Sequence, residues 1–401
     1  MKRRLFIKHA GKIIPLAYFA PSFLTKVFAQ QTASGSVIII GAGAAGLYAA
    51  KVLKEAGINV TILEASLVHG GRIKPLNDFS SIPIEMGAEE VHGKANTGGD
   101  PPSFLWSSIN DYDPSLLVEY ATLDIKEIFA LDDNYVTYPP YWDPDLEAVE
   151  SFINSMYLYS GDDVIMNDYL ADTFGITEGD RTWHLYEAWI GAEYGSSIKD
   201  YGMKSMAVSE NLWLTGGKNY ALNTSYLQLL ETLWFNPILE NIIYNKQATS
   251  IDYSGSSILV TCADGSEYSA DKVISAVPLS ILKENAISFT PALPVLNQNA
   301  IDTLEMGHGM KIILKFSEKF WGDDVYDITF KGSPTIAWSP GLIRSGGTDN
   351  LLLFFCMGER ADYLSSLGDD AIDVILTELD TLFDGEASEK YVDAVIQDWI
   401  K

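Results

Sequence analysis

Cysteine and histidine are both scarce in this sequence of 401 residues, which has two of the first and five of the second. The two cysteines, Cys262 and Cys356, stand far apart, so their spacing shows no disulfide framework. No two histidines have the separation that a metal site on a helix or a loop requires. We therefore expect no bound metal ion.

Basic residues are also scarce, since 27 lysines and arginines stand against 54 aspartates and glutamates, for a formal net charge of −27. This excess of negative charge disfavours binding to nucleic acid or anionic lipid and favours a cationic ligand. Solubility alone would also explain an acidic surface. The length and the 47% of hydrophobic residues suffice for two or three folded domains, and the composition does not set the oligomeric state.

Acidic residues are absent from the first 29 positions, which hold six basic residues. The apolar stretch within them, residues 13–25, is too short to cross a bilayer and contains two prolines, so we expect no stable membrane span. The order Arg3-Arg4-Leu5-Phe6-Ile7-Lys8 resembles a twin-arginine export signal. Residues 1–29 are therefore predicted to direct the chain to the periplasm or out of the cell, with an amphipathic membrane anchor as the alternative.

A strand, a glycine turn, a helix and a second strand follow one another near the N-terminus. The apolar run and the helical spacing place them at residues 36–40, 47–56 and 59–63, with Gly41, Gly43 and Gly46 in the turn. In this context the three glycines predict a dinucleotide-binding βαβ unit. A structural turn without a ligand is the alternative.

Each glycine has its own use in such a unit. Gly41 permits the tight turn, Gly43 lets the backbone approach a pyrophosphate, and Gly46 lets the helix pack against the strand. The helix N-terminus offers free N–H groups. Glu64 follows the second strand, where a carboxylate accepts hydrogen bonds from an adenosine ribose and repels the extra phosphate of NADP. The residues predicted to contact the dinucleotide here are Gly41, Gly43, Ala44, Ala45, Gly46 and Glu64.

Two further segments distinguish a flavin from a nicotinamide dinucleotide. Residues 64–72 end in a glycine pair and an arginine, and residues 85–93 read Glu-Met-Gly-Ala-Glu-Glu-Val-His-Gly. Both resemble segments of the flavin-containing amine oxidase family, of the monoamine and polyamine oxidase type, and the resemblance implies FAD as cofactor. It adds as FAD contacts Ala65, Gly70, Gly71, Arg72, Met86, Gly87 and Ala88. Ser66 departs from the family, where many members have a basic residue.

The similarity continues through residues 214–217, 247–251, 272–279, 287–294 and 307–321. It implies that the backbone at Ala248 meets the adenine, that His92 lines the substrate site, and that Lys311 is the catalytic lysine. Such a lysine holds a water molecule against the flavin, and burial would favour its neutral form. Without the resemblance, His92 would be taken for a surface or core residue. Lys311, which alternates with Lys315 along a strand, would be expected to face water.

The expected fold class is α/β, with a Rossmann-like FAD-binding domain and an interleaved α+β substrate-binding domain. The FAD-binding domain is predicted to comprise residues 36–95 and 205–285, and the substrate-binding domain residues 96–204 and 286–401, with a mostly helical insertion before residue 204. Asp143 is the predicted N-cap of the helix that follows it. Patterning predicts helices at 144–159, 182–194 and 370–383 and strands at 250–253, 257–262, 272–277 and 310–316.

The resemblance implies an enzyme that oxidises an amine. A hydride passes from the carbon bearing the nitrogen to the flavin, the imine hydrolyses, and molecular oxygen reoxidises the flavin to give hydrogen peroxide. An L-amino-acid oxidase or a flavin desaturase of the same fold is an alternative; a substrate carboxylate would need an arginine partner that the sequence does not reveal. A truncated, non-catalytic relative is another, because family members continue past the equivalent of Lys401 through a further flavin-binding stretch. The chain is then either a fragment or a weak flavin binder.

Overall fold

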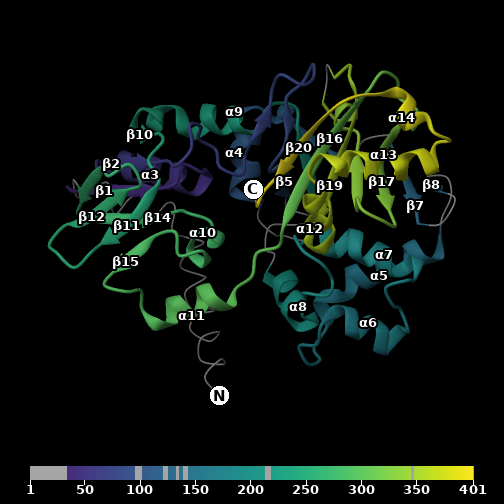
Figure 1. Ribbon diagram of the computed structural model, residues 1–401, viewed down its shortest axis with the longest axis horizontal. Helices are drawn as coiled ribbons and strands as arrows, with labels where there is room; N and C mark the ends of the chain where they lie inside the picture. The colour runs from purple at the N-terminus through teal and green to yellow at the C-terminus, as the bar shows by residue number, and fades with distance from the viewer. Residues whose placement is uncertain are drawn as a thin grey trace. The chain divides into compact units, whose positions relative to one another are not determined.

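The computed structural model describes residues 34–94, 102–120, 125–131, 135–138, 143–212, 218–344 and 347–400. The predicted export signal and the segment 214–217 lie outside these residues. Contacts divide the chain into two compact units (Figure 1). The first holds the chain up to Arg72 and Leu230–Leu304, and the second holds Ile73–Leu229 and Glu305–Lys401. Among the residues described, no helix has both the length and the apolar composition needed to cross a membrane.

The first unit is built on a parallel four-stranded sheet in the order β10-β2-β1-β14. Its elements are β1 (Ser36–Ile40), α3 (Ala44–Glu55), β2 (Asn59–Leu63), β10 (Ile242–Ile243) and β14 (Lys272–Ser275). Both predicted N-terminal strands have the bounds expected from the sequence, and the helix begins three residues earlier. The strand, glycine turn, helix and strand predicted from the sequence are confirmed.

A second sheet of this unit has the order β13-β12-β11-β15. Its strands are β11 (Ala248–Asp252), β12 (Ile258–Cys262), β13 (Glu267–Ala270) and β15 (Ser288–Thr290), followed by α11 (Val295–Thr303). The predicted meander is confirmed, and β14 then returns to the first sheet beside β1. The prediction of a buried strand up to residue 277 is wrong. β14 ends at Ser275 and is partly exposed, because it lies at the sheet edge with a neighbour on one side only.

A seven-stranded sheet forms the centre of the second unit, in the order β20-β16-β19-β18-β17-β7-β8 (Figure 1). All neighbours are antiparallel except β17 and β7, which are parallel. The strands are β7 (Lys126–Ala130), β8 (Val136–Tyr138), β16 (Gly309–Phe316), β17 (Val325–Phe330), β18 (Ile336–Trp338), β19 (Asn350–Met357) and β20 (Tyr391–Asp398). The helices α12 (Gly358–Leu367), α13 (Ala371–Leu382) and α14 (Glu386–Lys390) lie between β19 and β20 in sequence.

Strand β16 separates two apolar layers, because its side chains alternate between the faces of the sheet. Ile312 and Leu314 belong to the layer that contains the buried side chains of α12 and α13. Ile313 lies on the other face, where it packs in a cluster with Ile84. Lys311 shares that second face, so the chain near residue 84 covers the side on which a strand lysine would otherwise meet water.

Helices fill the part of the second unit between residues 143 and 212. They are α5 (Pro144–Ser155), η3 (Met156–Leu158), α6 (Met166–Phe174), α7 (Arg181–Tyr186), the π-helix η4 (Glu187–Ala192) and α8 (Met203–Leu212). Asp143 caps α5 as predicted, since its carboxylate accepts a hydrogen bond of 2.8 Å from the Asp145 N–H. The predicted helix 182–194 is present but changes from α to π geometry at Glu187. The described residues of the insertion are mostly helical, as predicted, and the insertion also supplies β7 and β8 to the large sheet.

The compact units differ from the predicted domain boundaries. The chain after residue 72 groups with the second unit, where β5 (Glu90–Lys94) pairs with β9 (Lys218–Leu222), which in turn pairs with β6 (Leu117–Glu119). Residues 286–304 group with the first unit, because β15 pairs in parallel with β11. The assignment of FAD binding and substrate binding to separate domains stays a prediction. Further elements of the second unit up to Leu229 are β3 (Pro75–Leu76), β4 (Ile84–Glu85), α4 (Phe104–Tyr112) and η1 (Pro114–Leu116), and α9 (Tyr226–Leu230) crosses the boundary between the units.

A buried histidine ties the end of β20 to β16 and α12. His308 contacts Asp398 Oδ1 through Nε2 and Asp362 Oδ1 through Nδ1, both at 2.8 Å. The Ser365 hydroxyl donates to the other Asp398 oxygen at 2.6 Å. Burial by itself raises the pKa of Asp398, but the hydrogen bonds from Ser365, the Ile400 N–H and His308 outweigh it and lower that pKa well below its usual range.

We expect Asp398→Asn to lower the free energy of unfolding by roughly 1–3 kcal/mol at neutral pH, because it removes the buried negative charge beside His308. The depressed pKa makes this stabilisation fully present above the unfolded-state pKa of about 3.9 and lost as the pH falls further. Urea unfolding should be measured from about pH 7 to about pH 3.5. The difference in free energy of unfolding between the variant and wild type should become smaller only below about pH 4.

The matched control is Asp362→Asn. Asp362 contacts the same imidazole, and its side chain is 67% exposed. Its effect should be small, because solvent screens an exposed pair. Equal losses in the two variants would contradict this account of the histidine.

Candidate active site

The glycine turn of the first unit has room for a ligand at one of its three glycines. Gly41 has a φ of +102°, which favours glycine, and its N–H donates to the Leu63 carbonyl at 2.9 Å. A side chain at Gly46 would lie 2.0 Å from the Gly41 carbonyl oxygen, so the helix approaches the turn too closely for any other residue. At Gly43 the nearest atom to an added Cβ is 4.0 Å away. The open side of the turn is therefore at Gly43, the N-cap of α3, where Ala44 and Ala45 begin the helix.

Glu64 links this turn to the loop that follows β2. Its Oε2 accepts a hydrogen bond of 2.7 Å from the Ala42 N–H. Its Oε1 accepts from the Ser66 N–H and hydroxyl, both at 2.9 Å. Each carboxylate oxygen can accept about two hydrogen bonds, so Oε2 keeps an acceptor position for a ribose hydroxyl. Ala65, between these contacts, is exposed.

The glycine pair packs against the turn, and the arginine beside it is free. The Gly70 N–H donates to the Ala42 carbonyl at 2.9 Å, and Gly70 forms a β-bridge with Gly43. Gly70 and Gly71 have φ values of +106° and +59°, which favour glycine. Arg72 is exposed and makes no hydrogen bond or ion pair with the residues that the structure describes. Open backbone, helix N–H groups and a free guanidinium fit the pyrophosphate of a dinucleotide.

Ala248 begins β11 in the same unit and is 5% exposed. Its backbone pairs with Cys262 of β12. The adenine contact implied by the resemblance stays a prediction.

In the second unit, Lys311 is buried and makes three polar contacts with one segment. Its Nζ donates to the carbonyls of Glu85 and Gly87 at 2.9 Å each and to Glu89 Oε2 at 3.1 Å. The residue is 5% exposed, so the expectation that a lysine at this point of a strand faces water is wrong. The cause is the segment that covers this face of β16.

These contacts also bear on the charge of Lys311. Two carbonyls and a carboxylate match the three N–H bonds of an ammonium group, whereas a neutral amine would leave one acceptor without a donor. The Nζ also lies 5.1 Å from the ring centre of Trp338, whose indole N–H donates to Glu89 Oε1 at 3.4 Å. The contacts of Lys311 therefore match an ion pair with Glu89, and the neutral form implied by the resemblance stays a prediction.

The segment that holds Lys311 is the one predicted to contact the flavin. Met86 is 2% exposed and packs in the apolar cluster around Ile313. Gly87 supplies one of the carbonyls, and Ala88 is exposed. The structure brings Lys311 close to Met86 and Gly87, and the contact of these residues with flavin stays a prediction.

Glu85 anchors this segment from inside the unit. It is fully buried, and its Oε1 accepts from the Tyr226 N–H at 2.8 Å and from Arg344 at 3.5 Å. Burial raises the pKa of Glu85 despite these contacts. Arg344 also donates to the Pro83 carbonyl. Sequence analysis missed Glu85, Glu89 and Arg344. Both glutamates stand in the recognised motif, but Arg344 carries no local signal.

Carboxylates and tyrosines continue from this segment along β5. Glu90 lies 3.7 Å from the His92 ring and hydrogen-bonds to Tyr120, whose ring centre is 5.7 Å from that of Tyr326. Burial raises the pKa of Tyr120 and Tyr326. The side chains of Glu90 and His92 are 37% and 45% exposed, so a solute reaches them. His92 Nδ1 also contacts the Asn219 amide oxygen at 2.9 Å, and its substrate role stays a prediction.

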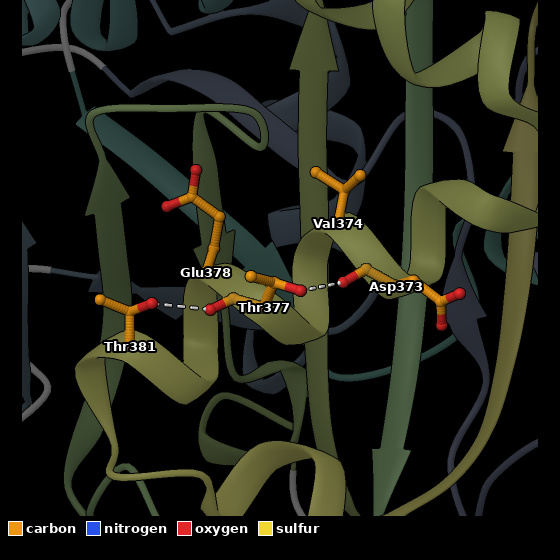
Figure 2. A pocket seen from close by; sticks show the side chains of 5 residues that line it. All are labelled: Asp373, Val374, Thr377, Glu378 and Thr381. Carbon is orange, nitrogen blue, oxygen red and sulfur yellow. Dashed lines mark hydrogen bonds between the residues drawn. The ribbon is translucent and has the colours of Figure 1, made fainter.

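A hollow on the surface of α13 does not coincide with these residues (Figure 2). Its lining side chains all come from this one helix: Asp373, Val374, Thr377, Glu378 and Thr381. The hydroxyls of Thr377 and Thr381 donate to carbonyls one turn earlier, at 2.8 and 2.9 Å. Since α13 packs on the face of the large sheet opposite to Lys311, we assign it no role. In the described part of the chain, no group of three or more His, Cys, Asp or Glu side chains could hold a metal ion.

Comparison with known proteins gives one family. The family model described as flavin containing amine oxidoreductase matches residues 44–104 and 154–401. Polyamine oxidase 4 of Oryza sativa is 28% identical over 386 residues, which cover 90% of this chain and 76% of the relative. Human lysine-specific histone demethylase 2 is 28% identical over 319 residues, covering 74% of this chain but 36% of the demethylase.

Solved structures show the fold. A putrescine oxidase variant superposes with a TM-score of 0.71 at 18% identity, covering 91% of this chain and 85% of that chain. The cyclohexylamine oxidase of Brevibacterium oxydans gives a TM-score of 0.70 at 18% identity, covering 91% and 84%. The predicted α/β class is confirmed.

The space at Gly43 yields a direct test of the cofactor site. Gly43→Val should fold normally, because the nearest atom to the added Cβ is the Gly71 Cα at 4.0 Å. It should lose FAD, because the side chain would fill the volume left for the pyrophosphate. The ratio of flavin absorbance to protein absorbance in the purified protein measures the loss, and circular dichroism checks the fold.

Gly179→Val is the matched control, since Gly179 also has open space around it and lies outside the glycine turn. It should keep both the fold and the flavin. Retention of FAD by Gly43→Val would show that the pyrophosphate binds elsewhere.

Proposed function

The chain belongs to the flavin-containing amine oxidoreductase family, whose cofactor is FAD, and from this premise we propose that it oxidises a cationic di- or polyamine with oxygen as the electron acceptor. The observation that carries the proposal is the burial of Lys311 against the segment 85–89. Bound FAD would take a hydride from the carbon next to the amine nitrogen and pass the electrons to oxygen, giving an imine that hydrolyses and hydrogen peroxide.

Residues of the first unit would hold the dinucleotide end of the cofactor. The backbone at Gly43 and the first N–H groups of α3 face the pyrophosphate, and Arg72 neutralises part of its charge. Glu64, whose Oε2 already accepts from the Ala42 N–H, would accept from the ribose hydroxyls with the same oxygen. The roles of Ala65, Gly70, Gly71 and Ala248 are to bring the backbone close to the cofactor.

In the second unit, Lys311 would orient a water molecule and hold a proton at Nζ. Two of its three contacts are to backbone carbonyls and fix the ammonium in place. The contact with Glu89 is the longest at 3.1 Å, and it is the one that a water molecule exchanges with. Glu89 then serves as the counter-charge, so the buried cation is never left unpaired.

The carboxylates near His92 support a cationic substrate. Glu90 is accessible, and the whole chain carries 54 acidic against 27 basic residues, so an ammonium group is attracted to this surface. Relatives and fold neighbours include polyamine oxidases and a putrescine oxidase bound to putrescine. The reacting nitrogen must be unprotonated, whereas a second nitrogen of a diamine stays charged and meets Glu90.

An L-amino-acid oxidase is the alternative of the same fold, and a substrate carboxylate would need a guanidinium. In the second unit, Arg344 is paired with Glu85 and Arg181 with Asp143. Arg360 donates to the His184 ring but has a buried Nη1 without a partner among the described residues. A truncated, non-catalytic relative is the alternative of another class, and it would be colourless even with added FAD.

We also propose export of the folded protein. The twin-arginine signal carries proteins that are already folded, which suits a chain that binds its cofactor in the cytoplasm. The residues concerned, 1–29, lie outside the described part of the chain.

Two lysines on the same face of β16 give a matched test of the catalytic assignment. Lys311→Met should keep FAD but slow its reduction by a diamine, its reoxidation by oxygen, or both, by about 100-fold or more, because a positioned proton and water are lost. Lys315 pairs with Asp349 at 2.6 Å, so Lys315→Met should leave both rates near wild type. Stopped-flow flavin absorbance measures the two half-reactions.

Removal of Lys311 alone leaves Glu89 buried without its cation, which destabilises the fold. The double variant Lys311→Met with Glu89→Gln removes both charges and checks that slow kinetics do not reflect misfolding. Wild-type rates in Lys311→Met would take this lysine out of the mechanism.

A further inference from the structure

The loop between Glu64 and the glycine pair holds its position with few contacts. Leu67 and Val68 are 77% and 65% exposed and join no apolar cluster of the described residues. The loop is fixed at its start, where Ser66 accepts from the Asn245 N–H, and at its end, where the Gly70 N–H donates to Ala42. After Ser66, His69 is the residue of this loop whose side chain hydrogen-bonds to another segment of the described chain.

His69 reaches two residues that come from another part of the first unit. Its Nε2 lies 2.6 Å from Glu231 Oε1, and its Nδ1 lies 2.9 Å from the Tyr244 hydroxyl. The side chains of His69 and Glu231 are only 17% and 24% exposed. Glu231 begins the π-helix η5 (Glu231–Phe235), and Tyr244 directly follows β10. The imidazole therefore ties the loop to two elements more than 160 residues away in sequence.

The direction of both hydrogen bonds follows from the neighbouring groups. Burial, together with Glu64 and Glu231, raises the pKa of Tyr244, so its hydroxyl stays protonated and donates to Nδ1. The Nε2–H then donates to the Glu231 carboxylate, so a neutral histidine satisfies both contacts. Since both ring nitrogens are occupied, His69 has no donor left for a phosphate.

Gly71 shows what this tie holds in place. A Cβ at Gly71 would lie 3.2 Å from the Gly43 Cα, so the glycine pair directly faces the open side of the glycine turn. A displacement of the loop at residue 69 moves Gly70, which forms the bridge to Gly43. The geometry beside the glycine turn therefore depends on the His69 side chain, whose two ring nitrogens are engaged by Tyr244 and Glu231.

We infer that His69, with Glu231 and Tyr244, is a positioning residue that orders the loop 65–71 before the cofactor binds and thereby raises the affinity for FAD. The inference rests on the proposed function only in naming FAD as the ligand. Ordering the loop in advance removes an entropy loss that binding would otherwise include. The part of FAD nearest to this loop would be its adenosine pyrophosphate end. The variants should therefore change the Kd of ADP in the same way as the Kd of FAD.

The test compares apo-protein variants in FAD and ADP binding and in amide hydrogen exchange. His69→Phe keeps the ring but loses both hydrogen bonds, and it should raise the Kd of FAD and of ADP by about tenfold or more and speed exchange at residues 66–71. Tyr244→Phe should also raise both Kd values and speed exchange at residues 66–71, but by smaller factors. Glu231→Gln keeps an acceptor for Nε2–H and should remain within about threefold of wild type.

Lys54→Met is the matched structural control. Lys54 ties α3 to the 3-10 helix η6 (Asn236–Asn241) of the same unit through Glu240 at 2.7 Å and Asn241 at 2.9 Å, away from the glycine pair. It should lower the melting temperature without changing either Kd or the exchange of residues 66–71.

Three results overturn the inference: unchanged loop exchange in His69→Phe, a Kd for both ligands within about threefold of wild type, or an equal loss of affinity in Lys54→Met. Failure of the wild-type protein to bind FAD would instead refute the proposed function. In that event the exchange comparison still decides whether His69 orders the loop.

Discussion

The burial of Lys311 in an ion pair with Glu89 is the constraint on which the candidate site depends. An ammonium group away from water needs acceptors for all of its N–H bonds, and here they come from Glu85, Gly87 and Glu89. β16 has no freedom to shift, because β19 and β20 pair along its whole length. Its even-numbered residues fill the core beneath the helices, so Lys311 must face the segment 85–89. The register of the sheet and the pairing of Lys311 with its acceptors therefore favour the same position of the Lys311 side chain.

The glycine turn of the first unit depends on a different constraint, which is the space around its backbone. Gly46 allows the helix to touch the turn, while Gly43 leaves a volume that no side chain fills. Glu64 holds two segments together through backbone N–H groups and still has an acceptor for a ligand. His69 fixes the loop between them. An open turn with a carboxylate acceptor, beside an Arg72 that has no polar partner among the described residues, suits the dinucleotide that we propose.

The sequence was sufficient where the signal is local. The βαβ unit, the Asp143 cap and the strand at residue 310 follow from spacing and turn residues, and all three are confirmed. The partners of Lys311 were not predictable, because Glu89 is 222 residues away in sequence and its pairing depends on tertiary structure. Alternation alone even gave the wrong environment for Lys311, since it describes the two faces of a strand but not what covers them.

The central claim is that this chain uses FAD to oxidise an amine, and an anaerobic titration of the purified holoprotein with putrescine tests it most directly. The account predicts that about one equivalent of putrescine removes the absorbance of the oxidised flavin, and that oxygen then restores it with about one equivalent of hydrogen peroxide. Bound FAD whose spectrum remains unchanged with putrescine and with longer polyamines would contradict it.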